Sequence, residues 1–155
     1  MPDNRLATEA PLVRDGYAIS TDRQRLDIDL IHGFLASSYW SAGIPRAVVE
    51  RGIANSLCFG LYRGAQQVGF ARVITDRASF AYLADVFVVD AHRAHGLGQW
   101  LIETILRHED LQGLRRFLLA TRDAHELYRR FGFDRLSNPD RLMEIHDPDA
   151  YGAAR

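Results

Sequence analysis

The spacing of apolar residues switches between two periods along this chain. Apolar side chains recur at helical spacing in residues 28–35, 45–53 and 100–106, and a shorter helical pattern covers residues 124–131. Runs rich in apolar, β-branched and aromatic residues favour strands. They occupy residues 17–20, 57–63, 67–74, 81–89, 117–120, 133–136 and 142–145. The pattern therefore predicts an α/β protein.

The order of these elements constrains the sheet. Two strand-like runs meet at a tight turn around Gly64, so they form a hairpin and pair antiparallel. The strand–helix–strand passage over residues 81–120 requires a parallel pair with a right-handed crossover. We therefore expect an α/β fold with a mixed central β-sheet of about six to seven strands, flanked by about four helices.

Length and composition favour one domain. The chain has 155 residues, of which 47% are hydrophobic and 25% charged, so it is long enough to bury a sizeable core. Residues 1–15 are polar, contain two prolines and show no period. We expect a flexible N-terminal tail over residues 1–15 and a single domain over residues 16–155.

Charge and residue usage exclude several classes of function. A net charge of −1 gives no basis for binding nucleic acid or an anionic membrane. Because the chain has neither an apolar signal core nor an apolar run of about 20 residues, we expect a cytoplasmic protein. Its basic residues include no lysine, which excludes a catalytic lysine from this chain. The single cysteine, Cys58, lies in an apolar run and is expected to be a buried structural thiol.

A glycine-containing turn joins the apolar strand over residues 81–89 to the helix that follows. It reads Arg93-Ala94-His95-Gly96-Leu97-Gly98. The first N–H groups of a helix lack intrahelical partners, and glycines let a phosphate approach them, so the turn is a candidate pyrophosphate cradle. A turn without a ligand is equally compatible with these residues alone. The turn does not match the dinucleotide-binding fingerprint, because Leu101 stands in place of the third glycine. It does not match the phosphate loop of nucleotide triphosphatases either, because that loop needs a lysine.

Two motifs, in order and at the right spacing, resemble those of the GNAT superfamily of acetyl-CoA-dependent N-acetyltransferases. The turn matches the family's Arg/Gln-x-x-Gly-x-Gly/Ala between a strand and a helix. The run Ala124-His125-Glu126-Leu127-Tyr128-Arg129-Arg130-Phe131-Gly132-Phe133 matches Ala-x-x-Leu/Phe-Tyr-x-x-x-Gly-Phe. The expected element order also fits the GNAT-like fold from Tyr17 onward. One departure is Thr121, where many members carry asparagine, and it bears on one side-chain contact to the cofactor.

The resemblance implies acetyl-CoA as the acetyl donor and assigns residues that hold it. In the family the sheet splays beside residues 87–89, whose backbone binds the pantetheine arm as an added strand would. The N–H groups of residues 94–99 would bind the pyrophosphate, while the side chain of Arg93 would either add charge or point into the sheet edge. The implied cofactor-binding set is Phe87, Val88, Val89, Arg93, Ala94, His95, Gly96, Leu97, Gly98, Gln99, Thr121 and Tyr128.

Tyr128 is the expected general acid. A phenol with a pKa of about 10 is protonated at pH 7, whereas a leaving thiolate similar to that of cysteine has a pKa of about 8.5. The phenol can therefore donate to the sulfur as it leaves, a contribution of about 10²–10⁴-fold to the rate. Outside the motif, a core tyrosine on a short helix would be the simpler interpretation.

Asp85 is the expected base or relay for the attacking amine. An ammonium group of pKa about 10.4 must lose a proton before it attacks, which costs about 4.6 kcal/mol at pH 7. Asp85 interrupts an apolar strand, and a buried carboxylate needs a partner or a role. A structural aspartate bonded to a backbone N–H or to an arginine is an equal alternative. Tyr82, on the same strand, would face the opposite side unless a bulge intervenes.

Aromatic residues indicate where the acceptor would bind. Tyr39 and Trp40 lie in the loop between the first two helices, which usually lines the acceptor pocket in the family. With Tyr82 and Asp85 they make up the expected substrate-binding set, suited to an apolar or cationic acceptor, although simple packing of this loop is an alternative. The histidines flanking the glycine turn have no metal-site spacing, so we expect no metal.

Together these features predict direct transfer of an acetyl group from acetyl-CoA to an amine of a small molecule or peptide. The alternative is a non-catalytic acyl-CoA-binding or sensing domain. The sequence does not identify the amine-bearing acceptor. Family members often form a homodimer, but no interface is marked in this sequence.

Overall fold

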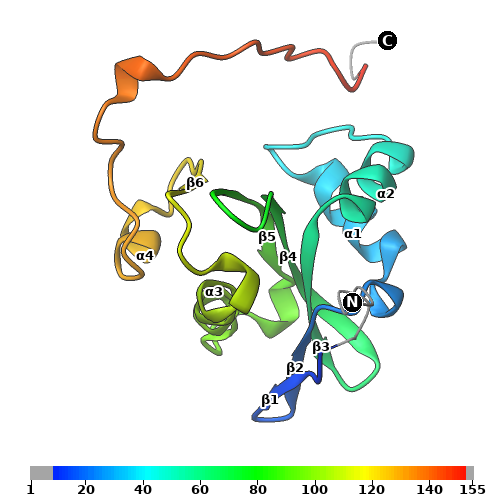
Figure 1. Ribbon diagram of the computed structural model, residues 1–155. Helices are drawn as coiled ribbons and strands as arrows, with labels where there is room; N and C mark the ends of the chain where they lie inside the picture. Colours follow the sequence, from blue (N-terminus) through cyan, green and yellow to red (C-terminus); the bar gives the residue numbers. More distant parts are fainter. Residues whose placement is uncertain (1–8, 153–155) are drawn as a thin grey trace, which may run out of the picture.

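The computed structural model describes residues 9–152 and contains a six-stranded sheet with helices on both faces (Figure 1). The strands are β1 (Leu12–Arg14), β2 (Tyr17–Ser20), β3 (Leu57–Arg63), β4 (Gln66–Thr75), β5 (Phe80–Val88) and β6 (Arg116–Leu119). They lie side by side in chain order, and neighbours are antiparallel except for the parallel pair β5 and β6. The predicted hairpin and the predicted parallel crossover are confirmed.

The α-helices in the described part of the chain are α1 (Ile28–Ser37), α2 (Arg46–Ala54), α3 (Leu97–Arg107) and α4 (His125–Arg129). Asp27 caps the N-terminus of helix α1, because its carboxylate accepts a hydrogen bond of 3.0 Å from the N–H of Leu30. Short 3₁₀ turns occupy Arg23–Arg25, Asp90–His92, Glu109–Leu111 and Pro139–Arg141. The mixed α/β fold expected from the sequence is therefore confirmed.

The sheet separates two hydrophobic clusters, because successive side chains of a strand point to opposite faces. On β3, Phe59 packs in the cluster under α3, whereas Cys58 packs in the cluster under α1 and α2. Cys58 is buried, as predicted, and burial raises the pKa of its thiol to about 12. The thiol therefore stays protonated at neutral pH and serves only in packing.

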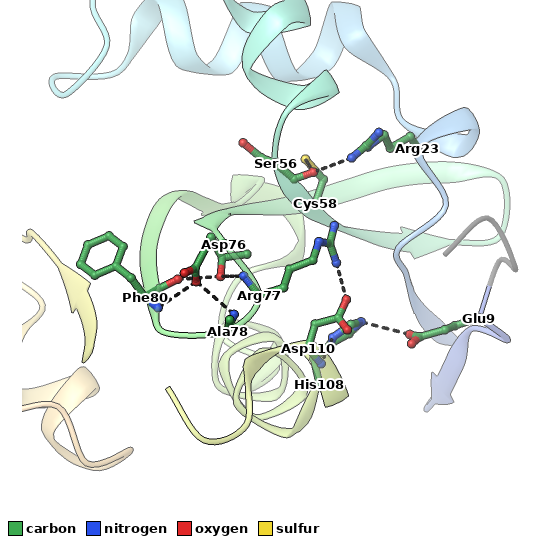
Figure 2. A network of polar contacts seen from close by, with 11 residues as sticks. Glu9, Arg23, Ser56, Cys58, Asp76, Arg77, Ala78, Phe80, His108 and Asp110 are labelled. Carbon is green, nitrogen blue, oxygen red and sulfur yellow. Dashed lines mark hydrogen bonds and ion pairs between the residues drawn. The ribbon is translucent and has the colours of Figure 1, made fainter. Parts of the chain in front are cut away.

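Hydrogen bonds and an ion pair stabilise the turn between β4 and β5 (Figure 2). The carboxylate of Asp76 accepts hydrogen bonds from the hydroxyl of Ser79 and from the N–H of Phe80, at 2.5 Å and 3.0 Å. The bonds from Ser79 hold the pKa of Asp76 well below its usual value. Arg77, at φ 63°, forms an ion pair with Asp110, beyond the end of α3. These contacts fix where β5 begins relative to α3.

A β-bulge interrupts the pairing of β5 with β4. The register shifts between Phe70 and Arg72, so that Ala71 lies opposite two residues of β5, Asp85 and Val86. Asp85 adopts the left-handed conformation at φ 57°. A bulge of this kind bends its strand and increases the local twist.

Beyond the bulge, the parallel pair separates. Pairing between β5 and β6 ends at Leu83 and Leu119, although β5 continues to Val88. The carboxyl half of β5 therefore stays paired with β4 alone. A gap opens between the ends of β5 and β6, as the family resemblance implied.

An ion pair holds the bulge in place. The Nε of Arg72 donates to Oδ2 of Asp85 at 2.8 Å, and a terminal nitrogen of the same guanidinium donates to the hydroxyl of Ser56 at 3.1 Å. The indole N–H of Trp40 donates to Oδ1 of Asp85 at 3.0 Å. The Asp85 side chain is only 8% exposed, so these donors replace the water that the carboxylate has lost.

Predictions for the two ends of the chain are partly wrong. Leu12–Arg14, expected in a flexible tail, forms β1 and pairs with β2, so the sheet begins earlier than predicted. Residues 1–8 of that tail lie outside the described residues. The strands expected over residues 133–136 and 142–145 are not formed, because neither segment pairs with a neighbouring strand of the described sheet.

Gly69→Ala is expected to lower the free energy of unfolding by about 1–3 kcal/mol in urea denaturation. A Cβ at this position would lie 2.9 Å from the carbonyl oxygen of Phe87 and 3.1 Å from the Cβ of Leu61. Gly33→Ala, in α1 with open space around it, is the matched control. It should leave stability unchanged or raise it by up to about 1 kcal/mol. Equal losses in the two variants would contradict the close strand packing.

Arg72→Ala is expected to lower the free energy of unfolding by about 3–5 kcal/mol, because it leaves the Asp85 carboxylate buried without its cation. The double variant Arg72→Ala/Asp85→Asn removes that charge and keeps a side chain that tolerates positive φ. It should therefore be more stable than Arg72→Ala alone in the same urea titration. A double variant no more stable than the single one would show that the buried charge is not the source of the loss.

Candidate functional site

The gap between β5 and β6 opens into a pocket of about 520 Å³, which we call the central pocket. Its walls come from the loop after α1, from β4 and β5, and from the segment that joins β6 to α4. The lining residues are Tyr39, Trp40, Ser41, Arg72, residues 82–86, residues 119–124 and Tyr128. A concave site with aromatic walls and a few charged groups is typical of a small-molecule site.

The central pocket brings together the four residues of the expected substrate-binding set. Tyr39 and Trp40 enter from the loop, with exposed fractions of 53% and 40%. Tyr82 and Asp85 enter from β5, although their odd separation would place them on opposite faces of a regular strand. The bulge at Asp85 removes this conflict, as the sequence argument required.

Asp85 lies in the pocket with both of its carboxylate oxygens engaged. One oxygen accepts from Arg72 and the other from the indole of Trp40. This is the arrangement that the sequence left open as the alternative to a free base, namely an aspartate paired with an arginine. In this geometry Asp85 orients the indole of Trp40 and pairs with the guanidinium of Arg72.

Sequence reasoning missed two arginines of the central pocket. Arg72 pairs with Asp85, and Arg122 stacks on Tyr39 with its guanidinium carbon 3.8 Å from the ring centroid. Arg72 carried a signal, because it interrupts an apolar strand just as Asp85 interrupts the next strand. Arg122 lies in a polar segment and carried none.

Tyr128 forms one wall of the central pocket from the short helix α4. Its side chain is half-buried and packs edge-to-face against Phe133, with ring centroids 5.9 Å apart. Burial, and to a smaller extent the neighbouring Tyr39, raises the pKa of the phenol. The hydroxyl therefore remains protonated to higher pH than that of a free tyrosine, which suits a proton donor. Helix α4 ends at Arg129, and the turn that follows it contains Gly132 at φ 97°.

The N-terminus of α3 fits the predicted phosphate cradle. Gly96 is the N-cap at φ 70°, and within residues 9–152 no side chain caps the helix. The first intrahelical bond runs from the N–H of Trp100 to the carbonyl of Gly96 at 3.1 Å, so the three preceding N–H groups point beyond the helix end. A Cβ at Gly96 or at Gly98 would meet open space within 4 Å, which leaves room for an anion against the backbone.

The end of β5 directs its backbone groups to two sides. The N–H of Val89 donates to the carbonyl of Val68 at 2.8 Å, so it is used within the sheet. Because backbone groups alternate along a strand, Phe87 also faces β4 and Val88 faces the gap. The side chain of Arg93 points back to the sheet edge, where its Nε donates to the carbonyl of Val88 at 3.0 Å.

The remaining residues of the predicted cofactor-binding set lie in the glycine turn and in the segment before α4. His95 lines a small pocket beside the N-terminus of α3, together with Arg14 and Arg63. The hydroxyl of Thr121 accepts a hydrogen bond of 3.0 Å from the N–H of Ala124 and so shapes the turn before α4. Of the other residues of the glycine turn, Ala94 adopts φ 68° and Leu97 is buried in the cluster under α3.

No group of three or more His, Cys, Asp or Glu side chains within residues 9–152 is arranged to hold a metal ion. No helix in the same range is long and apolar enough to cross a membrane.

Comparisons with known proteins agree with this geometry. The sequence profile of the family described as "Acetyltransferase (GNAT) domain" matches residues 54–135. A candidate acetyltransferase of Gibberella zeae is 33% identical over 138 residues, covering 74% of this chain and 77% of the relative.

Solved structures show the same fold. A candidate GNAT acetyltransferase from Xanthomonas campestris pv. campestris is 50% identical, with a TM-score of 0.86, over 88% of this chain and 97% of that one. A GNAT acetyltransferase from Elizabethkingia anophelis, solved with acetyl-CoA bound, is 12% identical, with a TM-score of 0.62, over 87% of this chain and 91% of that one. The family profile and the relative at 33% identity show that this protein belongs to the GNAT acetyltransferase family.

Proposed function

We propose that the protein is an N-acetyltransferase that transfers the acetyl group of acetyl-CoA directly to an amine. The supporting observation is that β5 and Tyr128 line the central pocket, while the turn before α3 contacts the side of β5 that lacks a neighbour, through the bond from Arg93 to the carbonyl of Val88. A cofactor arm and an acceptor could therefore approach each other between β5 and β6.

The chain's own groups suggest how the donor would be held. The N–H groups at the start of α3, where the helix dipole is positive, would bind the pyrophosphate. The backbone of Val88, on the side of β5 that lacks a neighbour, would bind the pantetheine arm as an added strand would. Acetyl-CoA supplies the activated acetyl thioester when bound.

Tyr128 would supply the proton for the leaving group. Direct transfer forms a bond between the amine nitrogen and the acetyl carbon and breaks the bond between that carbon and sulfur. The Tyr128 hydroxyl would donate its proton to the departing sulfur, and its raised pKa keeps this proton available at neutral pH.

The amine must also lose a proton before it attacks. In the observed geometry Asp85 does not offer a free carboxylate oxygen for this proton. Its two oxygens are held by Arg72 and Trp40, so we assign it a positioning role for the aromatic wall. Water in the open central pocket would then carry the amine proton away. Tyr39, Trp40 and Tyr82 would contact an apolar or cationic acceptor through their ring faces.

Gly98→Trp is expected to weaken binding of acetyl-CoA by at least about tenfold in calorimetric titration, because an indole at the start of α3 fills the space for the pyrophosphate. Gly98 is the sharper choice because Gly96 needs positive φ and would be strained by any side chain. Gly33→Trp, on the exposed side of α1, is the matched control and should bind as the wild type does. Unchanged binding of acetyl-CoA by Gly98→Trp would show that the pyrophosphate does not bind at this turn.

Tyr128→Phe is expected to lower kcat by about 10²–10⁴-fold while leaving the affinity for CoA unchanged. Thiol release from acetyl-CoA, with an amine acceptor found by screening, measures the first quantity, and calorimetry measures the second. Tyr151→Phe, which also removes one phenol hydroxyl but lies outside the central pocket, is the control. A wild type that binds CoA but acetylates no amine in the screen would instead support the non-catalytic binding domain.

A further inference from the structure

Arg122 joins two walls of the central pocket that lie far apart in the chain. It belongs to the segment between β6 and α4, and its guanidinium carbon is 3.8 Å from the ring centroid of Tyr39, in the loop after α1. Both residues line the central pocket. A guanidinium that stacks on an aromatic ring is attracted to the ring face by a cation–π contact. This contact holds a positive charge at a defined place on the pocket wall.

The ring on which Arg122 stacks is itself held in place. Tyr39 packs edge-to-face against Trp40, with ring centroids 5.2 Å apart. The indole N–H of Trp40 donates to Asp85 at 3.0 Å, and Asp85 is paired with Arg72. Successive contacts therefore link the Arg122 guanidinium to the buried ion pair of the sheet. Although the Arg122 side chain is 64% exposed, the pocket wall orients its charged end.

The N–H donors of Arg122 are available to a ligand. Stacking uses the flat face of a guanidinium, whereas its five N–H groups lie in the plane and point outward. Within residues 9–152, the ion-pair contact of Arg122 is with its neighbour Asp123, at 3.7 Å between nitrogen and oxygen. This distance is too long for a hydrogen bond, and both side chains are more than half exposed, so the pair contributes little.

A carboxylate is the ligand that best matches such a group. Its two oxygens accept two parallel hydrogen bonds from the edge of a guanidinium, which makes the contact both strong and directional. The buried charges of the pocket do not compete, because Arg72 and Asp85 are paired with each other. A cationic group is disfavoured at the same place, because one face of Tyr39 already carries Arg122 and like charges repel.

We propose that the acceptor is a small amine that also carries a carboxylate, as a free amino acid does, and that Arg122 binds this carboxylate. The inference rests on the proposed acetyl transfer and names the class of its acceptor. Tyr39 contacts Arg122 and also lies near Tyr128, whose pKa is raised by burial and, to a smaller extent, by Tyr39. A carboxylate bound at Arg122 would therefore leave its amine close to Tyr128. The apolar part of the acceptor would contact Trp40 and Tyr82.

Matched pairs of amino acids and their carboxamides test this assignment. Thiol release from acetyl-CoA is measured against the concentration of leucine, phenylalanine, methionine and glutamine, each beside its own amide. The amide lacks only the negative charge, and its amine is less basic, so the intrinsic availability of the free amine favours the amide. The wild type should nevertheless show a KM for the amino acid at least about tenfold below that for its amide.

Substitutions at Arg122 then assign the preference to this side chain. Arg122→Gln removes the charge and should raise KM for the amino acid at least about tenfold more than KM for the amide, so that the preference disappears. Arg122→Lys keeps the charge but loses the planar pair of donors, and it should retain only part of the preference. Arg130→Gln removes the same charge from an exposed position outside the central pocket, so this control should keep the full preference.

The possible failures point to different conclusions. If the wild type uses the amides as well as the amino acids, or acetylates only amines without a carboxylate, the inference is wrong and the acetyltransferase function stands. A preference that survives in Arg122→Gln would show that the carboxylate binds elsewhere, which also overturns the inference. Binding of CoA without acetylation of any amine would contradict the proposed function, and this inference with it.

Discussion

The ion pair between Arg72 and Asp85 is the contact on which the site depends. It holds a carboxylate that is 8% exposed on a strand residue at φ 57°, a combination that would be costly without the cation. The pair fixes the bulge, and the bulge turns the end of β5 away from β6. Pairing of β5 with β6 ends at Leu83, just before the bulge, and the next residues of β5 line the central pocket.

The ion pair between Arg72 and Asp85 also forms hydrogen bonds to residues outside the sheet. Through Asp85 it fixes the indole of Trp40, and through Arg72 it reaches the hydroxyl of Ser56, just before β3. The loop after α1, the bulge and the start of β3 are thus tied to one buried charge. A strand distortion, which is usually a local event, here sets the position of an aromatic wall of the pocket.

Local sequence was sufficient to predict most helices and strands. It was not sufficient to predict contacts between residues far apart in the chain. The apolar periods of β3 and α3 follow from their own residues, and the structure agrees. The glycine turn could also be placed, because a strand and a helix flank it. The bulge could not be located, since positive φ at an aspartate leaves no sequence signal, and Arg122 appeared unremarkable without its partner Tyr39. Residues 142–145 have strand character, but a strand needs an edge to pair with, and the sequence does not say which edge is free.

The absence of lysine and the burial of Cys58 limit the reaction mechanisms that are open to this chain. It has no lysine, and its single thiol is buried with a pKa of about 12, so neither of these common nucleophiles is available to carry an acyl group. Direct transfer then depends on holding two reactants in one gap, where alignment alone can supply a large part of the rate. Rigid walls matter more for such a reaction than reactive side chains do. The buried ion pair between Arg72 and Asp85 on one wall meets that need.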